Sequence, residues 1–349
     1  PTRPPARPRP PWRTPRMSGA LSYRAMQCMT LDGPDALALN TLESPPPGPG
    51  EARLRLDASG VNFPDLLMTR GLYQHKAEPP FIPGLEAAGT IVDVGEGVTG
   101  WKPGDRAVAM TGAAGAGFAE LSTVAADQLL PVPEGMSDLD AACLYVGHST
   151  GWNGVVDRGR LQPGETLVVA GAAGGVGLGA VQIGAALGAQ VIAIASTEEK
   201  RAVTLEEGAH HALDPADPDL KDKVWEITGG RGADLVYDPV GGRMFTEGVR
   251  MLRPEGRLAI IGFAGGDIAR IGSNIVLIKE IELIGVRAGQ YGRRHPEKRL
   301  EAWTRMSGWV AEGRFRPRVS RTFPLAEGAA ALKALEDRSV IGKVAVVMD

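Results

Sequence analysis

A glycine-rich turn between two apolar segments constrains this chain more than any other feature. Residues 167–195 read LVVAGAAGGVGLGAVQIGAALGAQVIAIA, with one apolar run before the glycines and a second after an alanine-rich segment. This order predicts a strand, a tight turn, a helix and a second strand, which is the βαβ unit of a dinucleotide-binding fold. A glycine-rich turn in an ordinary α/β protein is the alternative interpretation.

Each glycine of the turn has a predicted physical task. Gly171 lets the chain turn sharply after the first strand. Gly174 and Gly175 lack a Cβ, so a pyrophosphate can approach the backbone, and Gly177 lets the helix lie close to the strand. The helix then offers phosphate the free N–H groups and the positive dipole end of its first turn, at Val176.

Length and composition favour a two-domain protein of a reducing compartment. The chain has 349 residues and a net charge of −3, although residues 1–16 hold five arginines and no acid. The body is therefore more acidic than the total, which argues against nucleic acid as a partner. Cys28 and Cys143 are too few for a disulfide framework and favour the cytoplasm. The sequence has no uninterrupted apolar segment that could span a membrane, so we expect no membrane partner.

The first sixteen residues, PTRPPARPRPPWRTPR, form a predicted disordered tail of proline and arginine. We expect an upstream extension or cloning remnant ahead of a natural start at Met17. A targeting arm or a nucleic-acid-binding arm is the alternative, although the tail has neither an apolar core nor an amphipathic period.

The remaining chain has two parts that differ in the length and order of their predicted strands and helices. Residues 17–141 carry many short alternating segments separated by Gly/Pro turns, with a short helix predicted at 63–71, and indicate a small β-barrel-like domain. After Ser137, a predicted N-cap of one helical stretch over 139–157, strands and helices alternate as in a doubly wound parallel sheet. Ser196 is expected to cap a later helix through a capping box with Glu199.

Five motifs together resemble the medium-chain dehydrogenase/reductase superfamily, and within it the zinc-free, zeta-crystallin-like quinone oxidoreductase group. They are SGVNFPD at 59–65, GLY at 71–73, PGLEAAG at 83–89, AAGGVG at 172–177 and GKV at 342–344. The resemblance covers residue 17 to the end of the chain. It implies an α/β fold with a GroES-like, β-rich catalytic domain at 17–141 and 289–349. A Rossmann domain, a doubly wound parallel sheet, would occupy 142–288.

The same resemblance argues against a metal. Alcohol dehydrogenases of the superfamily place a zinc-binding cysteine where this chain has Val61 or Asn62, and a histidine where it has Leu85. A catalytic zinc needs about three converging ligands, and Glu86 alone remains, which we interpret as an ion-pair partner. We therefore expect no metal, which disfavours alcohol oxidation and favours hydride donation to an already electrophilic acceptor.

The second strand of the βαβ unit ends in a way that favours NADPH. NAD-specific sites carry an acidic residue at this tip, whereas this chain has Ala195, Ser196 and Thr197, whose hydroxyls accept a 2′-phosphate. The resemblance assigns Lys200 to that phosphate. The alternative is a solvated helix turn around Lys200, and Asp214, where the family often has tyrosine, would weaken phosphate binding.

The resemblance also implies which residues lie near the nicotinamide ring, where hydride would be transferred. It implies Asn62, Asp65 and Tyr73 as catalytic residues, with Asn62 able to hydrogen-bond the ribose or the acceptor oxygen. Tyr73 would stack on a flat acceptor or donate a proton. The further cofactor contacts that it implies are Ser149 or Thr150, Phe263, Ala264 and Lys343. For Asn62, Asp65 and Tyr73, a packing or turn role is the alternative.

These features predict an NADPH-dependent, zinc-independent reductase. It would transfer hydride to a small-molecule electrophilic acceptor, a quinone or an α,β-unsaturated carbonyl, with positioning as the main source of catalysis. An enoyl(-CoA) reductase of lipid or secondary metabolism is the first alternative. A structural or regulatory NADPH-binding protein with little turnover is the second. Family members pair through a sheet edge, so we expect a homodimer formed at the apolar segment 281–286.

Overall fold

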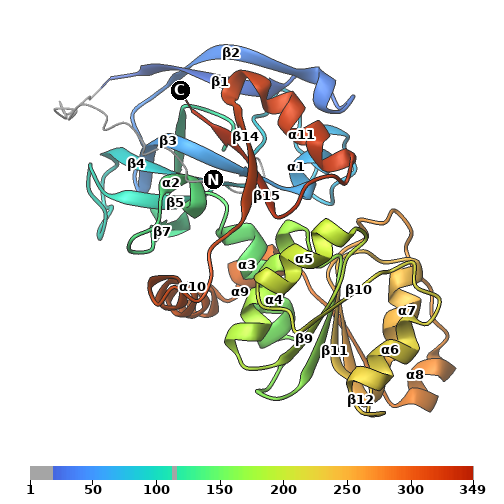
Figure 1. Cartoon of the computed structure of the whole chain (residues 1–349). Helices are drawn as coiled ribbons and strands as arrows, with labels where there is room; N and C mark the ends of the chain where they lie inside the picture. The colour runs from blue at the N-terminus through green and yellow to red at the C-terminus, as the bar shows by residue number, and fades with distance from the viewer. Residues whose placement is uncertain (1–18, 112–115, 349) are drawn as a thin grey trace.

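The computed structural model describes residues 19–111 and 116–348. Figure 1 shows two lobes, a β-rich lobe that contains the first strands and a lobe built on a parallel sheet with helices on both sides. The predicted fold class, a GroES-like β-rich domain with a Rossmann domain, is confirmed. The tail predicted at residues 1–16 lies outside the described residues.

The β-rich lobe is built from an antiparallel ribbon and a seven-stranded sheet. The ribbon pairs β1 (Leu21–Cys28) with β2 (Leu37–Ser44). The larger sheet has the order β14-β15-β3-β4-β5-β7, with β6 paired to β3. Its strands are β3 (Glu51–Val61), β4 (Glu86–Val94), β5 (Arg106–Met110), β6 (Leu121–Ala125), β7 (Leu129–Pro131), β14 (Val319–Pro324) and β15 (Lys343–Val347).

The pairing of β15 with β3 brings the last strand of the described chain back to the first lobe. The two strands are antiparallel, with Val344 opposite Val61 and Ala345 opposite Gly60. This register places Lys343 beside the end of β3, where helix α1 (Phe63–Thr69) begins. The exact domain limits stay a prediction, because α10 (Pro296–Ala311) packs in a core to which both lobes contribute.

The second lobe is a six-stranded parallel sheet with the order β10-β9-β8-β11-β12-β13. Its strands are β8 (Thr166–Ala170), β9 (Gln190–Ile194), β10 (His211–Leu213), β11 (Ala233–Asp238), β12 (Leu252–Ile260) and β13 (Glu282–Gly285). The strand order reverses direction at β8, as in a doubly wound fold. Ligands of such folds bind beyond the carboxyl ends of the strands at this reversal.

Alternating side chains of the central strands fill two separate cores. Val169 and Ala193 lie in a core with α3 (Tyr145–Trp152) and α4 (Gly175–Ala186). Val168 and Ile192 lie in the opposite core with α6 (Leu220–Ile227) and α7 (Arg243–Met251). Both faces of the sheet are thus covered, and each buried valine or isoleucine contributes roughly 1.5–3 kcal/mol.

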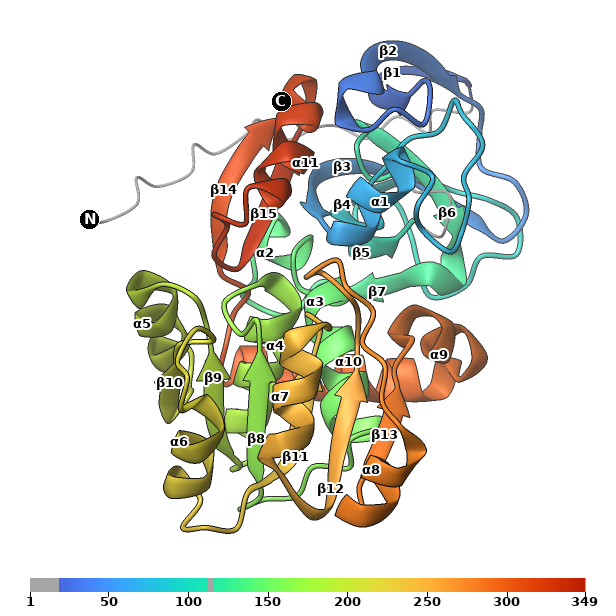
Figure 2. The same ribbon diagram turned by 90° about the vertical axis from the view of Figure 1, so that its right-hand side faces the viewer.

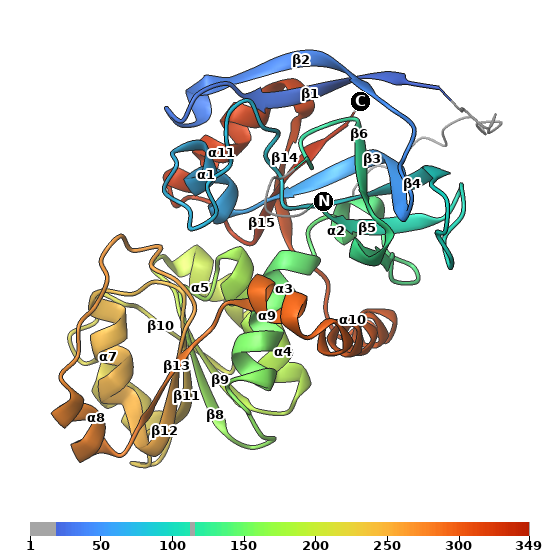
Figure 3. The same ribbon diagram turned by 180° about the vertical axis from the view of Figure 1, so that it is seen from behind.

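Figure 2 shows the arrowheads of β8 and β12 directed at the β-rich lobe. The carboxyl ends of the parallel strands therefore face the first lobe, so that the edge expected to bind a ligand lies between the lobes. Seen from behind in Figure 3, α9 (Ala288–Arg294) and α10 lie beside α3 at the same junction. The residues that the structure describes contain no helix long and apolar enough to cross a membrane.

The helical stretch predicted at 139–157 is divided into three parts. Ser137 caps α2 (Asp138–Ala141) as predicted, because its hydroxyl accepts a hydrogen bond from the Asp140 N–H at 3.1 Å. After α3 the chain continues as a π-helical turn, η3 (Asn153–Asp157). A Cβ at Gly154 would lie 2.6 Å from the Tyr237 ring, so the glycine admits the aromatic side chain of β11 at this turn.

Candidate functional site

The turn between β8 and α4 lies at the carboxyl edge of the sheet, and glycine is required at two of its positions. Gly171 has a φ of +56°, which residues with a Cβ rarely adopt. A Cβ at Gly177 would lie 2.8 Å from the Cα of Ala172, so α4 can approach the end of β8 only without a side chain there. The sequence pattern thus specifies the close packing of strand and helix.

The two glycines at the start of α4 differ in their surroundings. A Cβ at Gly174 would meet only the Gly171 carbonyl oxygen, at 3.5 Å, whereas a Cβ at Gly175 would lie 2.7 Å from Cδ of Lys343. Gly174 therefore leaves the backbone accessible, while the missing side chain of Gly175 makes room for Lys343. Gly174 is the N-cap and supplies no side-chain cap, so the first N–H groups of the helix, including that of Val176, are available to an anion.

Lys343 is the centre of a buried polar cluster beside this turn. Its Nζ donates to the Val61 carbonyl at 3.1 Å, to Asn62 Oδ1 at 2.5 Å and to Glu86 Oε1 at 2.8 Å. An ammonium group has three protons, so these three acceptors saturate it. The resemblance assigned Lys343 to the cofactor, but in this arrangement the amine holds the β-rich lobe together and has no proton left for a phosphate.

Glu86 is completely buried at the start of β4 and uses both carboxylate oxygens. Its Oε1 accepts from Lys343, and its Oε2 accepts from the Val146 N–H of α3 at 2.7 Å. The prediction of an ion pair at Glu86 is confirmed. Because a buried carboxylate needs both a cation and hydrogen-bond donors, this set of partners accounts for its burial.

Asn62 lies at the N-terminus of α1, and its side-chain amide is largely satisfied within the protein. Its Nδ2 donates to Gly60 O and to Glu86 Oε1, both at 3.1 Å, and the Lys343 ammonium fixes which end of the amide is oxygen. With both amide protons used, Asn62 has no donor for an acceptor oxygen. Its Oδ1 retains one lone pair, with which it can accept a hydrogen bond from a hydroxyl.

Asp65 has no exposed atom, and its carboxylate binds the backbone of two segments near Asn62. Its Oδ2 accepts the Asn62 N–H at 2.8 Å, and its Oδ1 accepts the Gly84 N–H at 3.1 Å. Burial raises the pKa of this carboxyl to about 7, against the opposing effect of the two backbone hydrogen bonds and Lys343. The sequence suggested a catalytic contact, but the geometry favours a positioning role, in which the carboxylate binds backbone N–H groups at the start of α1 and at Gly84.

The other residues predicted to lie near the nicotinamide are more exposed than Asn62 and Asp65. Tyr73 is half-buried and packs against a small core that contains Met68 and Phe81. The Thr150 hydroxyl donates to the Val146 carbonyl of its own helix at 2.6 Å, which leaves only acceptor capacity for a ligand. Phe263 and Ala264 follow β12 at the carboxyl edge of the sheet, and both are exposed.

The residues predicted to select the dinucleotide lie at the tip of β9, before α5 (Glu198–Glu206). Ser196 and Thr197 are exposed there, but the helix cap differs from the prediction. Thr197, rather than Ser196, is the N-cap, and its hydroxyl accepts from the Lys200 N–H at 3.2 Å. The predicted box with Glu199 does not form because the helix begins one residue later than its pattern requires.

A neighbouring ion pair changes the expectation for Asp214. Arg201 donates from Nη1 to Asp214 Oδ2 at 2.9 Å and to the Ala195 carbonyl at 3.0 Å. Because Asp214 is paired with a cation, its charge repels a nearby phosphate less than an isolated carboxylate would. We therefore expect a smaller effect of Asp214 on phosphate binding than the sequence alone indicates.

Arg338, in the loop between α11 (Gly328–Glu336) and β15, is a candidate site residue that the sequence reasoning missed. Its carbonyl accepts a hydrogen bond from Lys200 Nζ, and its Nη2 donates to the Ala264 carbonyl at 3.4 Å. The loop thus links the start of α5 to the turn after β12, both at the carboxyl edge of the sheet. No periodicity marks an isolated arginine in a loop, and only the proximity of the GKV motif could have drawn attention to it.

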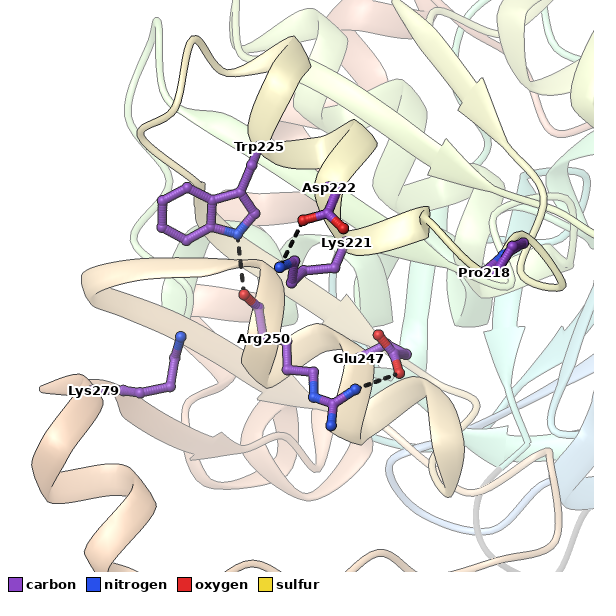
Figure 4. A pocket seen from close by; sticks show the side chains of 7 residues that line it. All are labelled: Pro218, Lys221, Asp222, Trp225, Glu247, Arg250 and Lys279. Carbon is purple, nitrogen blue, oxygen red and sulfur yellow. Dashed lines mark hydrogen bonds and ion pairs between the residues drawn. The ribbon is translucent and has the colours of Figure 1, made fainter.

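A surface pocket of about 500 Å³ lies elsewhere, between α6, α7 and the end of α8 (Ser273–Lys279), as Figure 4 shows. Two of its cations are paired locally, Lys221 with Asp222 at 2.6 Å and Arg250 with Glu247 at 3.3 Å. The Trp225 indole donates to the Arg250 carbonyl at 3.1 Å. The pocket lies on α6 and α7, which cover the sheet face opposite to α3 and α4, and none of the residues predicted for the site lines it. We therefore assign the candidate site to the junction between the lobes.

The metal positions of the alcohol dehydrogenases contain other residues here. Val61 forms the end of β3, Asn62 is engaged as described, and Leu85 packs beside a small apolar core. Within residues 19–111 and 116–348, the His, Cys, Asp and Glu side chains form no group of three or more that could hold a metal ion.

Comparison with known proteins places these features in a family. Residues 48–134 match the alcohol dehydrogenase GroES-like domain, and residues 175–306 match the zinc-binding dehydrogenase domain. A quinone oxidoreductase-like protein 2 homolog from Nematostella vectensis is 33% identical over 335 residues, covering 94% of this chain and 90% of the relative. A 2-haloacrylate reductase from Burkholderia sp is 32% identical over 332 residues, covering 90% and 96% of the two chains.

A solved structure agrees with these relatives. The Escherichia coli quinone oxidoreductase complexed with NADPH superposes with a TM-score of 0.85 at 27% identity, covering 94% of this chain and all of that one. Similarity of this extent, together with the two matched domains, covers both lobes and the junction between them. The chain therefore belongs to the quinone oxidoreductase group of the medium-chain dehydrogenase/reductase superfamily.

Proposed function

We propose that this protein is an NADPH-dependent, metal-independent reductase whose acceptor is a quinone or an α,β-unsaturated carbonyl. Reduced nicotinamide supplies the hydride when it is bound. The observation that carries the proposal is the open backbone at Gly174, at the start of α4, held beside the saturated Asn62–Lys343 cluster of the other lobe. Relatives named as quinone oxidoreductases and as a 2-haloacrylate reductase support the acceptor class.

The residues at the junction suit positioning better than proton transfer. Val176 and its neighbours would bind the diphosphate with backbone N–H groups, and Asn62 would accept a hydrogen bond from a ribose hydroxyl. Tyr73, which is half-buried, would stack on a flat acceptor or donate a proton from its hydroxyl. Solvent can supply the same proton, so no dedicated acid is needed.

Metal independence is part of the proposal because the residues present are unsuited to zinc. Valine and leucine side chains cannot ligate it, and both oxygens of Glu86 are already engaged by Lys343, Asn62 and Val146. A quinone or enone is already electrophilic, so it needs no Lewis acid. We expect exhaustive chelation to leave the reductase activity unchanged.

The preference for NADPH over NADH rests on the tip of β9. Ser196 and Thr197 present hydroxyls where a carboxylate would repel the 2′-phosphate, and Lys200 follows them on α5. A neighbouring structure of the family was solved with NADPH. Lys200 Nζ would exchange its carbonyl partner, Arg338, for the phosphate, since a charge-assisted hydrogen bond is the stronger one.

A homodimer in the cytoplasm completes the proposal. β13 is the outermost strand of the parallel sheet in the described chain, and Leu277 and Ile278 of α8 are 77% and 74% exposed beside it. Cys28 and Cys143 are buried and free, which suits a reducing compartment. Analytical ultracentrifugation tests the dimer, and a monomer at micromolar concentration would contradict it.

The decisive experiment is NADPH oxidation with a panel of quinones, enones and enoyl-CoA thioesters, measured at 340 nm. We expect turnover with quinones or simple enones and a lower rate with NADH. Turnover confined to enoyl-CoA thioesters would favour an enoyl reductase, for which exposed Arg294 on α9 offers a cation to a phosphate-bearing acceptor. Tight NADPH binding without turnover of any acceptor would favour the structural or regulatory alternative.

A further inference from the structure

The carboxylate of Glu86 joins three segments that meet at the junction between the lobes. Its Oε1 is shared by Lys343 Nζ of β15 and Asn62 Nδ2 at the start of α1, at 2.8 and 3.1 Å. Its Oε2 accepts the backbone N–H of Val146 in α3 at 2.7 Å. One side chain therefore connects one strand and two helices from different parts of the chain.

The contact with Val146 replaces a helix cap. The N-cap residue of α3, Leu144, has no side-chain acceptor, so the first N–H groups of the helix need a partner from elsewhere. Glu86 supplies it from the other lobe. Thr150, one turn further along α3, bonds to the carbonyl of the same Val146, so the position of Thr150 depends on the residue that Glu86 holds.

Helix α3 in turn packs closely on the helix that begins at the glycine turn. A Cβ at Gly147 would lie 2.9 Å from the Gly175 carbonyl oxygen, and one at Gly151 would lie 3.0 Å from the backbone of Gly179. Such close packing leaves the two helices little freedom to move separately. A displacement of α3 would therefore also displace the first turn of α4.

Lys343 closes the connection on the other side. Its side chain lies against Gly175, where a Cβ would be 2.7 Å from Cδ, and its amine bonds to both Asn62 and Glu86. The backbone supports the arrangement, because Gly342 donates to the Ala173 carbonyl at 2.7 Å. The glycine turn and Asn62 are thus connected through a single buried ion pair.

A glycine in β3 shows that the fold makes room for Glu86. A Cβ at Gly60 would lie 2.5 Å from Glu86 Oε1 and 2.5 Å from the Ala142 carbonyl oxygen. Any other residue would displace the carboxylate or the segment that leads into α3. The space for Glu86 is therefore specified by the sequence independently of its hydrogen bonds.

We propose that Glu86 is a positioning residue, which couples the orientation of Asn62 to the placement of helix α3 and the glycine turn. The proposal rests on the proposed function, in which the glycine turn binds the diphosphate of the cofactor and Asn62 accepts a hydrogen bond from one of its ribose hydroxyls. Glu86 touches neither cofactor nor acceptor. It acts by keeping the binding groups of the two lobes in one fixed geometry, in which a displacement of about 1 Å can cost on the order of 100-fold in rate.

The test compares three variants with a matched control. Glu86→Gln keeps the shape but removes the charge, Glu86→Asp keeps the charge but shortens the reach, and Glu86→Gln with Lys343→Met replaces the pair by neutral groups. Glu165→Gln is the control, because Glu165 also pairs with a buried arginine, Arg257, at 2.6 Å and accepts a loop N–H, but precedes β8 at the opposite edge of the sheet. Each is measured for thermal midpoint, kcat and KM for NADPH.

Glu86→Gln and Glu86→Asp are expected to lower kcat about 10- to 100-fold with a smaller change in KM. In the double variant the thermal midpoint should recover relative to Glu86→Gln while kcat stays low. The control should lose thermal stability but keep its kcat. Recovery of kcat together with stability in the double variant, or an unchanged kcat in both single variants, would overturn the proposal.

A second measurement keeps the proposal separate from the proposed function. Amide hydrogen exchange over residues 145–152 should be faster in Glu86→Gln than in the wild type and unchanged in Glu165→Gln. If no acceptor is reduced by the wild type, the proposed function fails. Faster exchange in α3 with weaker NADPH binding would still support the coupling. Unchanged exchange would refute the coupling even in an active enzyme.

Discussion

Two buried ion pairs of this protein lie at opposite ends of the parallel sheet and differ in what they join. Arg257 and Glu165, at the amino ends of the strands, tie the loop before β8 to β12 within one lobe. Lys343 and Glu86, beyond the carboxyl ends, connect β15, β4, α1 and α3 and are nearly inaccessible, with side-chain exposures of 6% and 0%. Similar chemistry therefore serves local stability at one end and the candidate site at the other.

Removing the cation should affect the two ion pairs very differently. Lys343→Met leaves Glu86 charged and fully buried, which should reduce the free energy of unfolding by about 3–5 kcal/mol. Arg257→Met should cost less, about 1–3 kcal/mol, because Glu165 is 19% exposed and can be hydrated. Urea unfolding followed by circular dichroism measures both. Equal losses would mean that burial of the carboxylate does not distinguish the two ends.

The pH dependence of stability provides the second comparison, through Asp65 at the junction. Burial raises its pKa in the folded protein to about 7, above its ordinary value of 3.8, so the folded state retains a proton that the unfolded chain has lost between these values. The contribution of Asp65 to stability is greatest below pH 4 and declines as the pH rises through 7, by roughly 1 kcal/mol per unit.

Asp65→Asn cannot titrate, so the difference in unfolding free energy between wild type and variant should shift in favour of the variant from pH 4.5 to 7.5. Chemical unfolding at four pH values measures this difference, and titration of all other groups cancels between the two proteins. A difference that stays constant with pH would show that Asp65 is already ionised throughout this range.

A smaller effect should distinguish the candidate cofactor site at the tip of β9 from the pocket of Figure 4. Lys200→Ala should lower the ratio of kcat/KM for NADPH over NADH about tenfold, since one charge-assisted hydrogen bond is worth about 1.5–3 kcal/mol. Lys221→Ala removes a lysine of that pocket that is half-buried, as Lys200 is, and should leave the ratio unchanged. An equal change in both variants would indicate a general effect of net charge.

Local patterns in the sequence predict most of the fold. The glycine spacing before α4, the apolar runs of β8 and β9 and the cap at Ser137 each depend on residues close together in the chain. Periodicity and turn chemistry determine such features, so they can be read without knowledge of the tertiary structure. The resemblance to a family supplied the remaining outline, including the return of the last elements.

The polar cluster at the junction could not be predicted in the same way. Glu86 and Lys343 are 257 residues apart, and they meet only because β15 pairs with β3 in a particular register. The pairing of β3 with β4 brings Glu86 beside Asn62, so that Gly60 and Glu86 use both of its amide protons, which the sequence left free to bind an acceptor oxygen. The role of Arg338 likewise depends on how distant segments meet, because its carbonyl accepts a hydrogen bond from Lys200.

The late position of β15 in the chain has a consequence for biosynthesis. When a ribosome has made β3 and β4, the strand that carries Lys343 is still more than 200 residues from being translated. Until then Glu86 has no Lys343 beside it and residues 58–61 of β3 lack the neighbour that β15 provides, which leaves a nascent intermediate with an incomplete sheet. The β-rich lobe must therefore mature after the lobe that is translated in its middle.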